Sequence, residues 1–282
     1  HASIIVPFVL GSALALYLYP RFSNADVPFT SFALFLGISM SITAFPVLAR
    51  ILSDLKITTT EVGLIALTCA AVDDVTAWCL LALVVAVVHA SAGSAVVVTL
   101  LTLAFIGVMF IAVRPWITRA LRASQDVEPR RGQLAMAIVA VLLAALITEA
   151  IGVHALFGAF LLGAVIPHDS RLARTLLTSF DNLVTILLLP AFFAFAGMRT
   201  EIGLLSGPEA WITCGLLILV ATLGKFGGTL LAARAGGATW RVAAALGILM
   251  NTRGLMELIA LNIGYDLGIL SPRIFAMLVI MA

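Results

Sequence analysis

Charge is what this sequence lacks most. Only 11% of its 282 residues are charged, against about 25% in an average soluble domain. Hydrophobic residues make up 62%, and the mean hydropathy is +1.18. Such a composition cannot cover a water-facing surface, so we expect the lipid bilayer to be the main partner of the chain. The short basic clusters have no interleaved aromatic residues, and nothing in the sequence indicates nucleic-acid binding.

Ligand clusters and catalytic motifs are also missing. The three cysteines, Cys69, Cys79 and Cys214, lie inside apolar stretches without metal-ligand spacing, so we expect small buried hydrophobic side chains. No nucleophile–base pair, phosphate-binding loop or metal cluster stands out, and the sequence predicts neither an enzyme nor a bound cofactor. Because the chain begins at His1 and ends inside an apolar segment, we expect it to be a fragment of a longer protein.

Long apolar segments separated by short polar turns are what the sequence contains instead. Most are long enough, at about 1.5 Å per residue, to cross a hydrocarbon core of about 30 Å as a helix. None alternates over about ten residues as a membrane β-barrel strand would. We therefore predict an all-α polytopic membrane protein with ten membrane elements, the last one cut short. They are expected at residues 2–19, 28–52, 62–88, 95–113, 133–151, 154–166, 175–198, 211–233, 240–264 and from 272 onward.

Two of these segments contain helix-breaking sequences. Pro46 disfavours helix in the residue before it, so we expect the chain to unwind around residues 43–45, a simple proline kink being the alternative. The second interruption is expected at residues 251–254. Irregular backbone at membrane depth is tolerated only where it is buried in protein or lines a cavity. Paired interrupted helices near the two ends of a chain indicate a transporter built from inverted repeats.

The distribution of basic residues supports opposite orientations for the two ends of the chain. When the connections are numbered alternately, one side collects most of the arginines and lysines, and the positive-inside rule makes that side cytoplasmic. The smaller set is Arg21, Arg199 and Arg273, and five residues of the larger set, Arg114, Arg119, Arg122, Arg130 and Arg131, are expected in one basic loop. The rest of the larger set is Arg50, Lys56, Arg171, Arg174, Arg234 and Arg241. The first three membrane elements and the last three each comprise a span, an interrupted span and a further span. The two triplets are therefore predicted to be antiparallel.

Two adjacent carboxylates, Asp73 and Asp74, fall near the middle of the segment 62–88. An ionisable group at that depth is costly and marks a functional site by default; the alternative is a soluble core helix with a buried, paired carboxylate. Adjacent carboxylates resist simultaneous ionisation in a desolvated site. Such a pair can exchange protons for a hard cation that prefers oxygen ligands.

Few other ionisable residues fall within predicted spans. Lys225 is a natural partner for one aspartate, either as a participant in transport or in a static ion pair. Arg253 and Glu257 are spaced i, i+4 and can pair along one helix face, in a structural or a transport role. For the remaining candidates we expect structural roles: Glu149, His154 and Asp181.

Four motifs in order resemble the monovalent cation:proton antiporter-2 family, and especially its cation/H⁺ exchanger branch. They are residues 41–50 (SITAFPVLAR), 71–75 (AVDDV), 154–160 (HALFGAF) and 251–258 (NTRGLMEL). The resemblance covers essentially the whole chain. It implies the sodium/proton-antiporter fold, with two crossed broken helices and a core domain that moves against a dimerisation domain. It also implies that the family's opening helices and any soluble C-terminal domain lie outside this sequence.

The same resemblance implies roles for individual residues. Asp74 matches the ion- and proton-binding aspartate, where a monovalent cation would bind transiently, and Lys225 matches the lysine that pairs with Asp73. Thr43 is expected to take part in ion binding. The supporting positions at the two interruptions are Ala44, Phe45, Pro46, Asn251, Thr252, Arg253 and Glu257.

The predicted function is exchange of a monovalent cation, K⁺ or Na⁺, for H⁺ by alternating access. The alternatives are a sodium-coupled solute symporter of related fold and a ligand-gated K⁺ efflux channel-like protein. We expect a homodimer of the full-length protein in the plasma membrane. The predicted divisions are a first core repeat (1–92), a linker span with a cytoplasmic loop (93–130), dimerisation-side helices (131–207) and a second core repeat (208–282).

Overall fold

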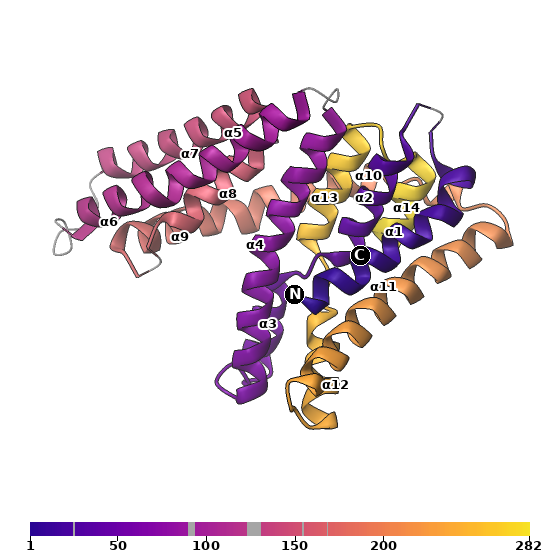
Figure 1. The fold of residues 1–282 in the computed structure, drawn as a ribbon. Helices are drawn as coiled ribbons and strands as arrows, with labels where there is room; N and C mark the ends of the chain where they lie inside the picture. Colours follow the sequence, from indigo (N-terminus) through magenta and orange to yellow (C-terminus); the bar gives the residue numbers. More distant parts are fainter. Residues whose placement is uncertain (25, 90–93, 123–130, 154, 168) are drawn as a thin grey trace. The chain divides into compact units, whose positions relative to one another are not determined.

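Every regular element of the described chain is helical. The computed structural model (Figure 1) describes residues 1–24, 26–89, 94–122, 131–153, 155–167 and 169–282 and contains no strand within them. In these ranges, 7 helices are long and apolar enough to cross a membrane, and one further pair, bent by 46°, passes the same test together. Two shorter apolar helices, Ala155–Val165 and Pro272–Met281, complete the set. The all-α, multi-pass membrane fold is therefore confirmed.

The chain divides into two compact units. The first comprises His1–Leu81 and Ala196–Ala282, and the second comprises Ala82–Phe195. The boundaries between the units fall within α4 and α10.

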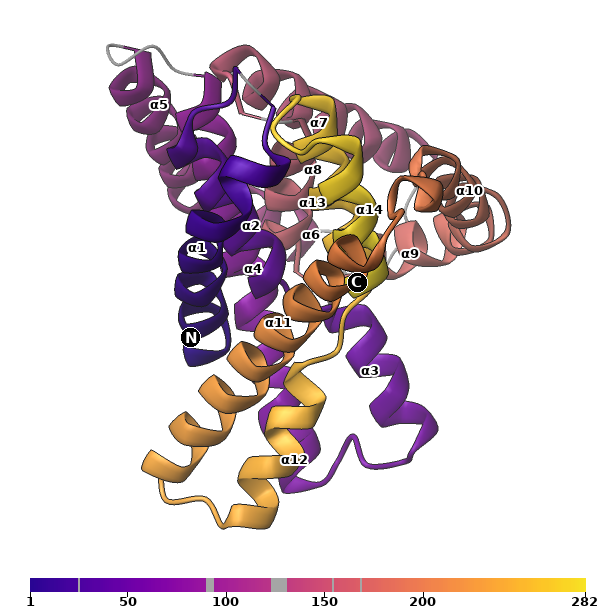
Figure 2. The same ribbon diagram turned by 90° about the vertical axis from the view of Figure 1, so that its right-hand side faces the viewer.

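The first unit contains the two ends of the chain (Figures 1 and 2). Helix α1 packs against α2 and α11, α11 packs against α12 and α14, and α13 packs against α2 and α14. Its helices are α1 (Ala2–Phe22), α2 (Phe29–Ser41), α3 (Phe45–Asp54), most of α4 (Glu61–His89), the end of α10 (Leu189–Arg199), α11 (Pro208–Ala235), α12 (Trp240–Met250), α13 (Leu255–Asp266) and α14 (Pro272–Met281).

The second unit is a smaller helical group. Helix α7 packs against α5, α8 and α9. Its helices are α5 (Ser94–Val108), α6 (Arg114–Arg122), α7 (Arg131–Ile151), α8 (Ala155–Val165) and α9 (Arg171–Leu183), and π-helical turns at Met109–Val113 and Val184–Leu188 continue α5 into α6 and α9 into α10.

The predicted basic loop is wrong over much of its length. Arg114, Arg119 and Arg122 lie on α6, and Arg131 opens α7; Arg130 lies outside the described residues. The cluster of arginines after the apolar segment predicted a loop, but the helix continues through Pro115, although proline breaks an ordinary helix. The π-helical turn just before it accommodates the ring by widening the helix. The same arrangement precedes Pro190 in α10.

Both predicted interruptions are present. The first leaves Ile42, Thr43 and Ala44 outside helices, one residue earlier than expected, because Phe45 already begins α3. Pro46 then occupies the first turn of α3, where a missing N–H costs nothing. The second interruption separates α12 from α13 at residues 251–254, as predicted.

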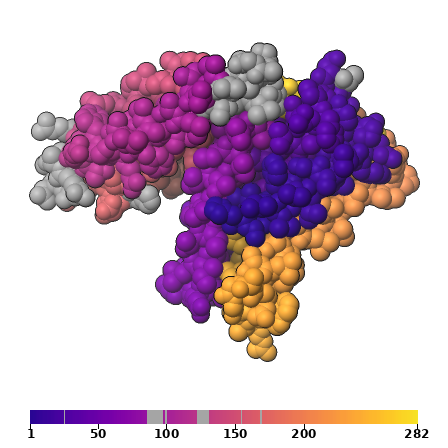
Figure 3. All heavy atoms as spheres, in the orientation of Figure 1, coloured from indigo at the N-terminus to yellow at the C-terminus, as the bar shows by residue number. Residues whose placement is uncertain are grey.

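Glycines allow α1 to pack closely against α11. A Cβ at Gly224 would lie 3.0 Å from Pro7 Cα, and one at Gly228 would lie 2.9 Å from the Ala2 carbonyl oxygen. Small residues four apart allow such backbone approach between membrane helices. In the space-filling view of Figure 3, the indigo atoms of α1 adjoin the orange atoms of α11. The first turn of α1 is thus held against the helix that carries Lys225.

A second packed region connects α3, α4 and α12, beyond the two interruptions. Its buried members are Leu48, Leu52, Ala66, Ala70, Leu246 and Met250. This cluster holds the second half of the first broken helix, α3, beside the first half of the other, α12 (Figure 2).

Candidate functional site

The two broken helices meet backbone to backbone. The Ala44 N–H donates to the Thr252 carbonyl oxygen at 3.0 Å, so each interruption satisfies a polar group of the other. At Gly254 the backbone has φ of 153°, and an added Cβ would lie 3.3 Å from Val47 Cγ2. A residue without a side chain therefore suits this close approach.

Asp73 lies at the centre of a buried hydrogen-bonded chain. Its Oδ2 accepts from Ser3 Oγ at 2.5 Å and from Thr43 Oγ1 at 3.4 Å. Thr43 Oγ1 in turn accepts from Lys225 Nζ. Lys225 and Thr43 are fully buried, and Asp73 is 1% exposed. The chain of contacts brings together α1, α4, α11 and the interruption between α2 and α3.

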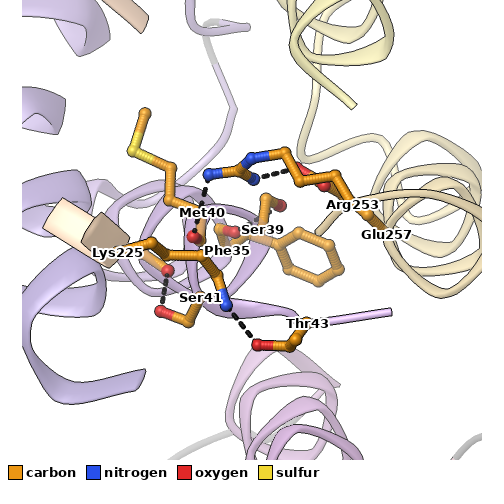
Figure 4. A network of polar contacts seen from close by, with 9 residues as sticks. Phe35, Ser39, Met40, Ser41, Thr43, Lys225, Arg253 and Glu257 are labelled. Carbon is orange, nitrogen blue, oxygen red and sulfur yellow. Dashed lines mark hydrogen bonds and ion pairs between the residues drawn. The ribbon is translucent and has the colours of Figure 1, made fainter. Parts of the chain in front are cut away.

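Lys225 reaches Asp73 only through the threonine. Figure 4 shows the lysine amine directed at Thr43, and within the described part of the chain Lys225 forms no ion pair with either aspartate. The implied Lys225–Asp73 pair is therefore replaced in this structure by a relay through one hydroxyl group.

Asp74 is set apart from this network. It is half-buried, and its Oδ1 is buried without a hydrogen-bond partner among the described groups. Successive helix residues project about 100° apart, so the two carboxylates occupy different sides of α4. The structure thus places Asp73, rather than Asp74, in contact with Thr43.

Arg253 and Glu257 form a buried ion pair beside the crossing. Arg253 Nη1 donates to Glu257 Oε1 at 2.8 Å, and the two side chains are 8% and 0% exposed. Arg253 Nη2 also approaches the Met40 carbonyl oxygen at 3.5 Å, near the end of α2 (Figure 4). Each charge suits the helix end that it approaches. The Arg253 guanidinium lies near the C-terminus of α2, and Glu257 lies in the first turn of α13. Glu257 Oε2 has no partner among the described groups.

The whole chain matches one protein family. A family model described as "Sodium/hydrogen exchanger, transmembrane" matches residues 1–282. The chain belongs to the sodium/hydrogen exchanger family. This family consists of transporters, not enzymes.

Individual relatives of this exchanger-family chain come from bacteria, plants and yeast. It is 44% identical over 285 residues to "Na(+)/H(+) antiporter NhaS4" of Synechocystis sp., covering 100% of the chain and 70% of that protein. It is 42% identical over 289 residues to "Cation/H(+) antiporter 18" of Arabidopsis thaliana, covering 100% of the chain and 35% of the relative. Identity to "K(+)/H(+) antiporter 1" of Saccharomyces cerevisiae is 31% over 290 residues, covering 99% and 33%. The chain thus spans about a third of the plant and yeast relatives.

The residues predicted to support the two interruptions make different kinds of contact. Ala44 and Thr252 contribute backbone groups to the crossing, and the Thr252 hydroxyl donates to the Leu249 carbonyl oxygen at 2.6 Å. Asn251 is the C-cap residue that follows α12, and its Oδ1 is buried without a partner among the described groups. Phe45 packs against the α3–α4–α12 cluster, and Pro46 is exposed.

A small apolar cavity lies beside the crossing. Its volume is about 10 Å³, and it is lined by Ile42, Ala77, Trp78, Leu81 and Met256. That volume is at the lower limit for one water molecule. The cavity therefore cannot hold a hydrated cation in this conformation.

Two hydrogen-bond acceptors or donors of the buried charged residues were not predicted from the sequence. They are the Ser3 hydroxyl and the Met40 carbonyl oxygen. A serine in an apolar segment is a weak signal, because hydroxyl groups commonly bond to their own helix. A backbone carbonyl leaves no signal at all.

The three residues expected to be structural have different outcomes. Glu149 Oε2 accepts from Ala155 N at 2.9 Å, at the start of α8, which is a capping contact. Asp181 is exposed on α9. His154, the first residue of the third motif, lies outside the described residues.

Proposed function

We propose that the full-length protein exchanges a monovalent cation, K⁺ or Na⁺, for H⁺ across a membrane, with Asp74 as the group that the two ions occupy in turn. The names of the bacterial and yeast relatives, Na⁺/H⁺ and K⁺/H⁺ antiporters, support this activity and this range of cations.

The balance of formal charges at the crossing is the observation that carries the proposal. Lys225 and Arg253 are two positive groups, and Asp73 and Glu257 are two negative groups. Lys225 and Asp73 are linked through the Thr43 hydroxyl, Arg253 and Glu257 form a separate ion pair, and the four side chains are at most 8% exposed. Asp74 is the carboxylate left over, and one of its oxygens has no partner among the described groups. A partly desolvated, unbalanced carboxylate favours binding either a proton or a cation.

Competition for one carboxylate explains how the two fluxes are coupled. A proton on Asp74 removes the negative charge that a cation needs, and a bound cation disfavours protonation. The α2 and α12 helix ends and the unwound carbonyls at the crossing contribute partial charges without adding mobile groups. Alternating access to this one carboxylate from the two sides then exchanges one ion for the other.

The remaining assignments concern the assembly and its membrane. We propose residues 1–92 and 208–282 as the two core repeats, residues 93–130 as the linker and residues 131–207 as the dimerisation side. The compact units instead divide at Leu81 and Ala196, and the predicted boundaries at 92/93 and 130 fall outside the described residues. A homodimer in the plasma membrane completes the proposal; light scattering of the purified protein and membrane fractionation test it.

The decisive experiment uses the full-length protein in proteoliposomes with an internal pH dye and a clamped membrane potential. A K⁺ or Na⁺ gradient should drive proton movement, and Asp74→Asn should abolish it. Asp54→Asn is the matched control, because Asp54 carries an exposed carboxylate on α3. Normal proton flux in Asp74→Asn would contradict the proposed site.

The alternatives predict different records from the same vesicles. A sodium-coupled symporter would require an added organic solute and move no counter-proton. A gated channel would pass K⁺ without proton movement and would respond to an added ligand. Either record from the wild-type protein would contradict the exchange reaction.

A further inference from the structure

Ser3 contacts Asp73 from α1, a helix that carries none of the predicted site residues. It lies in the first turn of α1 and is 6% exposed. Its hydroxyl donates to Asp73 Oδ2 at 2.5 Å, 70 residues away in sequence. A hydroxyl donating to a carboxylate at this distance forms a short, charge-assisted hydrogen bond.

The position of Ser3 is set by close backbone packing. Gly228 of α11 faces the Ala2 carbonyl oxygen and Val6, leaving no room for a side chain between the helices. The first turn of α1 therefore cannot shift independently of α11. Because α11 also carries Lys225, the hydroxyl of Ser3 and the amine of Lys225 belong to one packed pair of helices.

Asp73 and Lys225 have the means to pair directly but do not. Both are buried, both contact Thr43, and a direct ion pair in a low-dielectric site would be strongly attractive. Asp73 Oδ2 instead accepts from two hydroxyl groups, one on α1 and one at the interruption. Loss of the Ser3 donor would leave Asp73 Oδ2 with Thr43 as its one remaining hydroxyl donor among these two. Lys225 is the nearest cation along the chain of contacts and could then take the place of Ser3.

We propose that Ser3 is a positioning residue: its hydrogen bond holds Asp73 on hydroxyl partners and out of a direct ion pair with Lys225. Because the Asp73 carboxylate is then not in direct contact with the ammonium, its negative charge attracts a cation at the neighbouring Asp74. This attraction strengthens cation binding at Asp74. The inference rests on the proposed exchange at Asp74. It assigns to α1 a part in setting cation affinity.

The test measures apparent KM and kcat for K⁺ and Na⁺ in proteoliposomes of the full-length protein, with choline replacing the cation at constant ionic strength. Ser3→Ala should raise KM about tenfold, the size expected for one lost hydrogen bond to a charged group, with kcat nearly unchanged. Ser3→Thr, which keeps the hydroxyl, should restore KM. Ser12→Ala is the matched control, because Ser12 lies on α1 but donates to the Ala33 carbonyl oxygen.

A double-mutant cycle separates positioning from packing. In a Lys225→Gln background there is no ammonium for Asp73 to approach, so Ser3→Ala should leave KM unchanged. An equal rise in both backgrounds, or no rise in the wild-type background, would overturn the inference. If Ser3→Ala does not fold, Ser3→Cys replaces it, since it has nearly the same size and is a weaker donor.

Cation-dependent thermal stabilisation of the purified protein provides a readout that does not require turnover. Ser3→Ala should need about ten times more K⁺ or Na⁺ than wild type for half-maximal stabilisation. Equal requirements in the two proteins would overturn the inference. Cation-dependent stabilisation of the wild-type protein without proton exchange would instead contradict the proposed function. The cation concentrations that wild type and Ser3→Ala require would then still decide the role of Ser3 in cation affinity.

Discussion

Two ion pairs with the same i, i+4 spacing show how burial changes the value of a contact. Arg253–Glu257 has side chains 8% and 0% exposed, whereas Arg50–Asp54 has side chains 79% and 62% exposed. A buried charge that loses its partner cannot be solvated, and an exposed one can. The same sequence pattern therefore stabilises the crossing in one place and contributes little in the other.

Replacing each arginine by glutamine tests this difference. Arg253→Gln should lower the free energy of unfolding by about 3–5 kcal/mol, because Glu257 is left buried and unpaired. Arg50→Gln should change it by about 0–1 kcal/mol. Thermal unfolding of the purified protein in detergent measures both. Equal shifts for the two variants would contradict a special role of burial.

The Thr43 hydroxyl connects Lys225 to Asp73, so removing this hydroxyl should disturb both charged groups. Thr43→Val keeps the shape but removes the shared hydroxyl, and should reduce cation-driven proton flux about 10- to 100-fold, as expected when a buried charged group loses its partner. Thr43→Ser should retain most of the flux.

Thr213→Val is the control for the Thr43 series. Thr213 is equally buried, but its hydroxyl donates to the Glu209 carbonyl oxygen within α11. A similar loss of flux in Thr213→Val would show that the effect is not specific to the relay.

At the scale of elements, close packing of α1 on α11 holds the charged groups in register. Gly227 and Gly228 are neighbours in sequence but differ in their surroundings. A Cβ at Gly228 would meet backbone and side-chain atoms of α1, whereas a Cβ at Gly227 would have no such atom within 4 Å. The two glycines therefore serve different purposes in one helix.

The two glycines predict opposite results for the same substitution. Gly228→Ala should destabilise the protein by about 1–3 kcal/mol through overpacking. Gly227→Ala should stabilise α11 by up to about 1 kcal/mol, because alanine favours helix. Thermal unfolding in detergent again provides the measurement, and destabilisation by Gly227→Ala would contradict the assigned packing.

At the scale of the whole molecule, the basic residues predict an orientation in the membrane. The distribution of basic residues predicts that the α3–α4 connection is cytoplasmic and that the segment after α10 faces the opposite side. The two broken helices cross, but the antiparallel relation of the two repeats stays a prediction.

Cysteine labelling tests this orientation. In a background with Cys69, Cys79 and Cys214 replaced by alanine, Ser53→Cys should react with a membrane-impermeant maleimide only from the cytoplasmic side. Glu201→Cys should react only from the other side; both positions are exposed. Labelling of both from one side would contradict the predicted topology.

The sequence by itself determined the membrane class, the two interruptions and the set of intramembrane charges. Hydropathy adds up along a segment, and a proline or glycine disturbs the backbone where it stands, so these properties are local. The error at α6 was local too, because the cluster of arginines predicted a loop and nothing in the sequence signals the π-helical turn before Pro115.

Only the tertiary structure decided which groups meet at the crossing. It placed Asp73 against Thr43, interposed Thr43 between Asp73 and Lys225, and added Ser3 from α1. Those contacts depend on how each helix is rotated about its axis and how closely its neighbours approach. Rotation and approach are settled by packing between residues far apart in the chain, and the order of residues in one segment does not specify them.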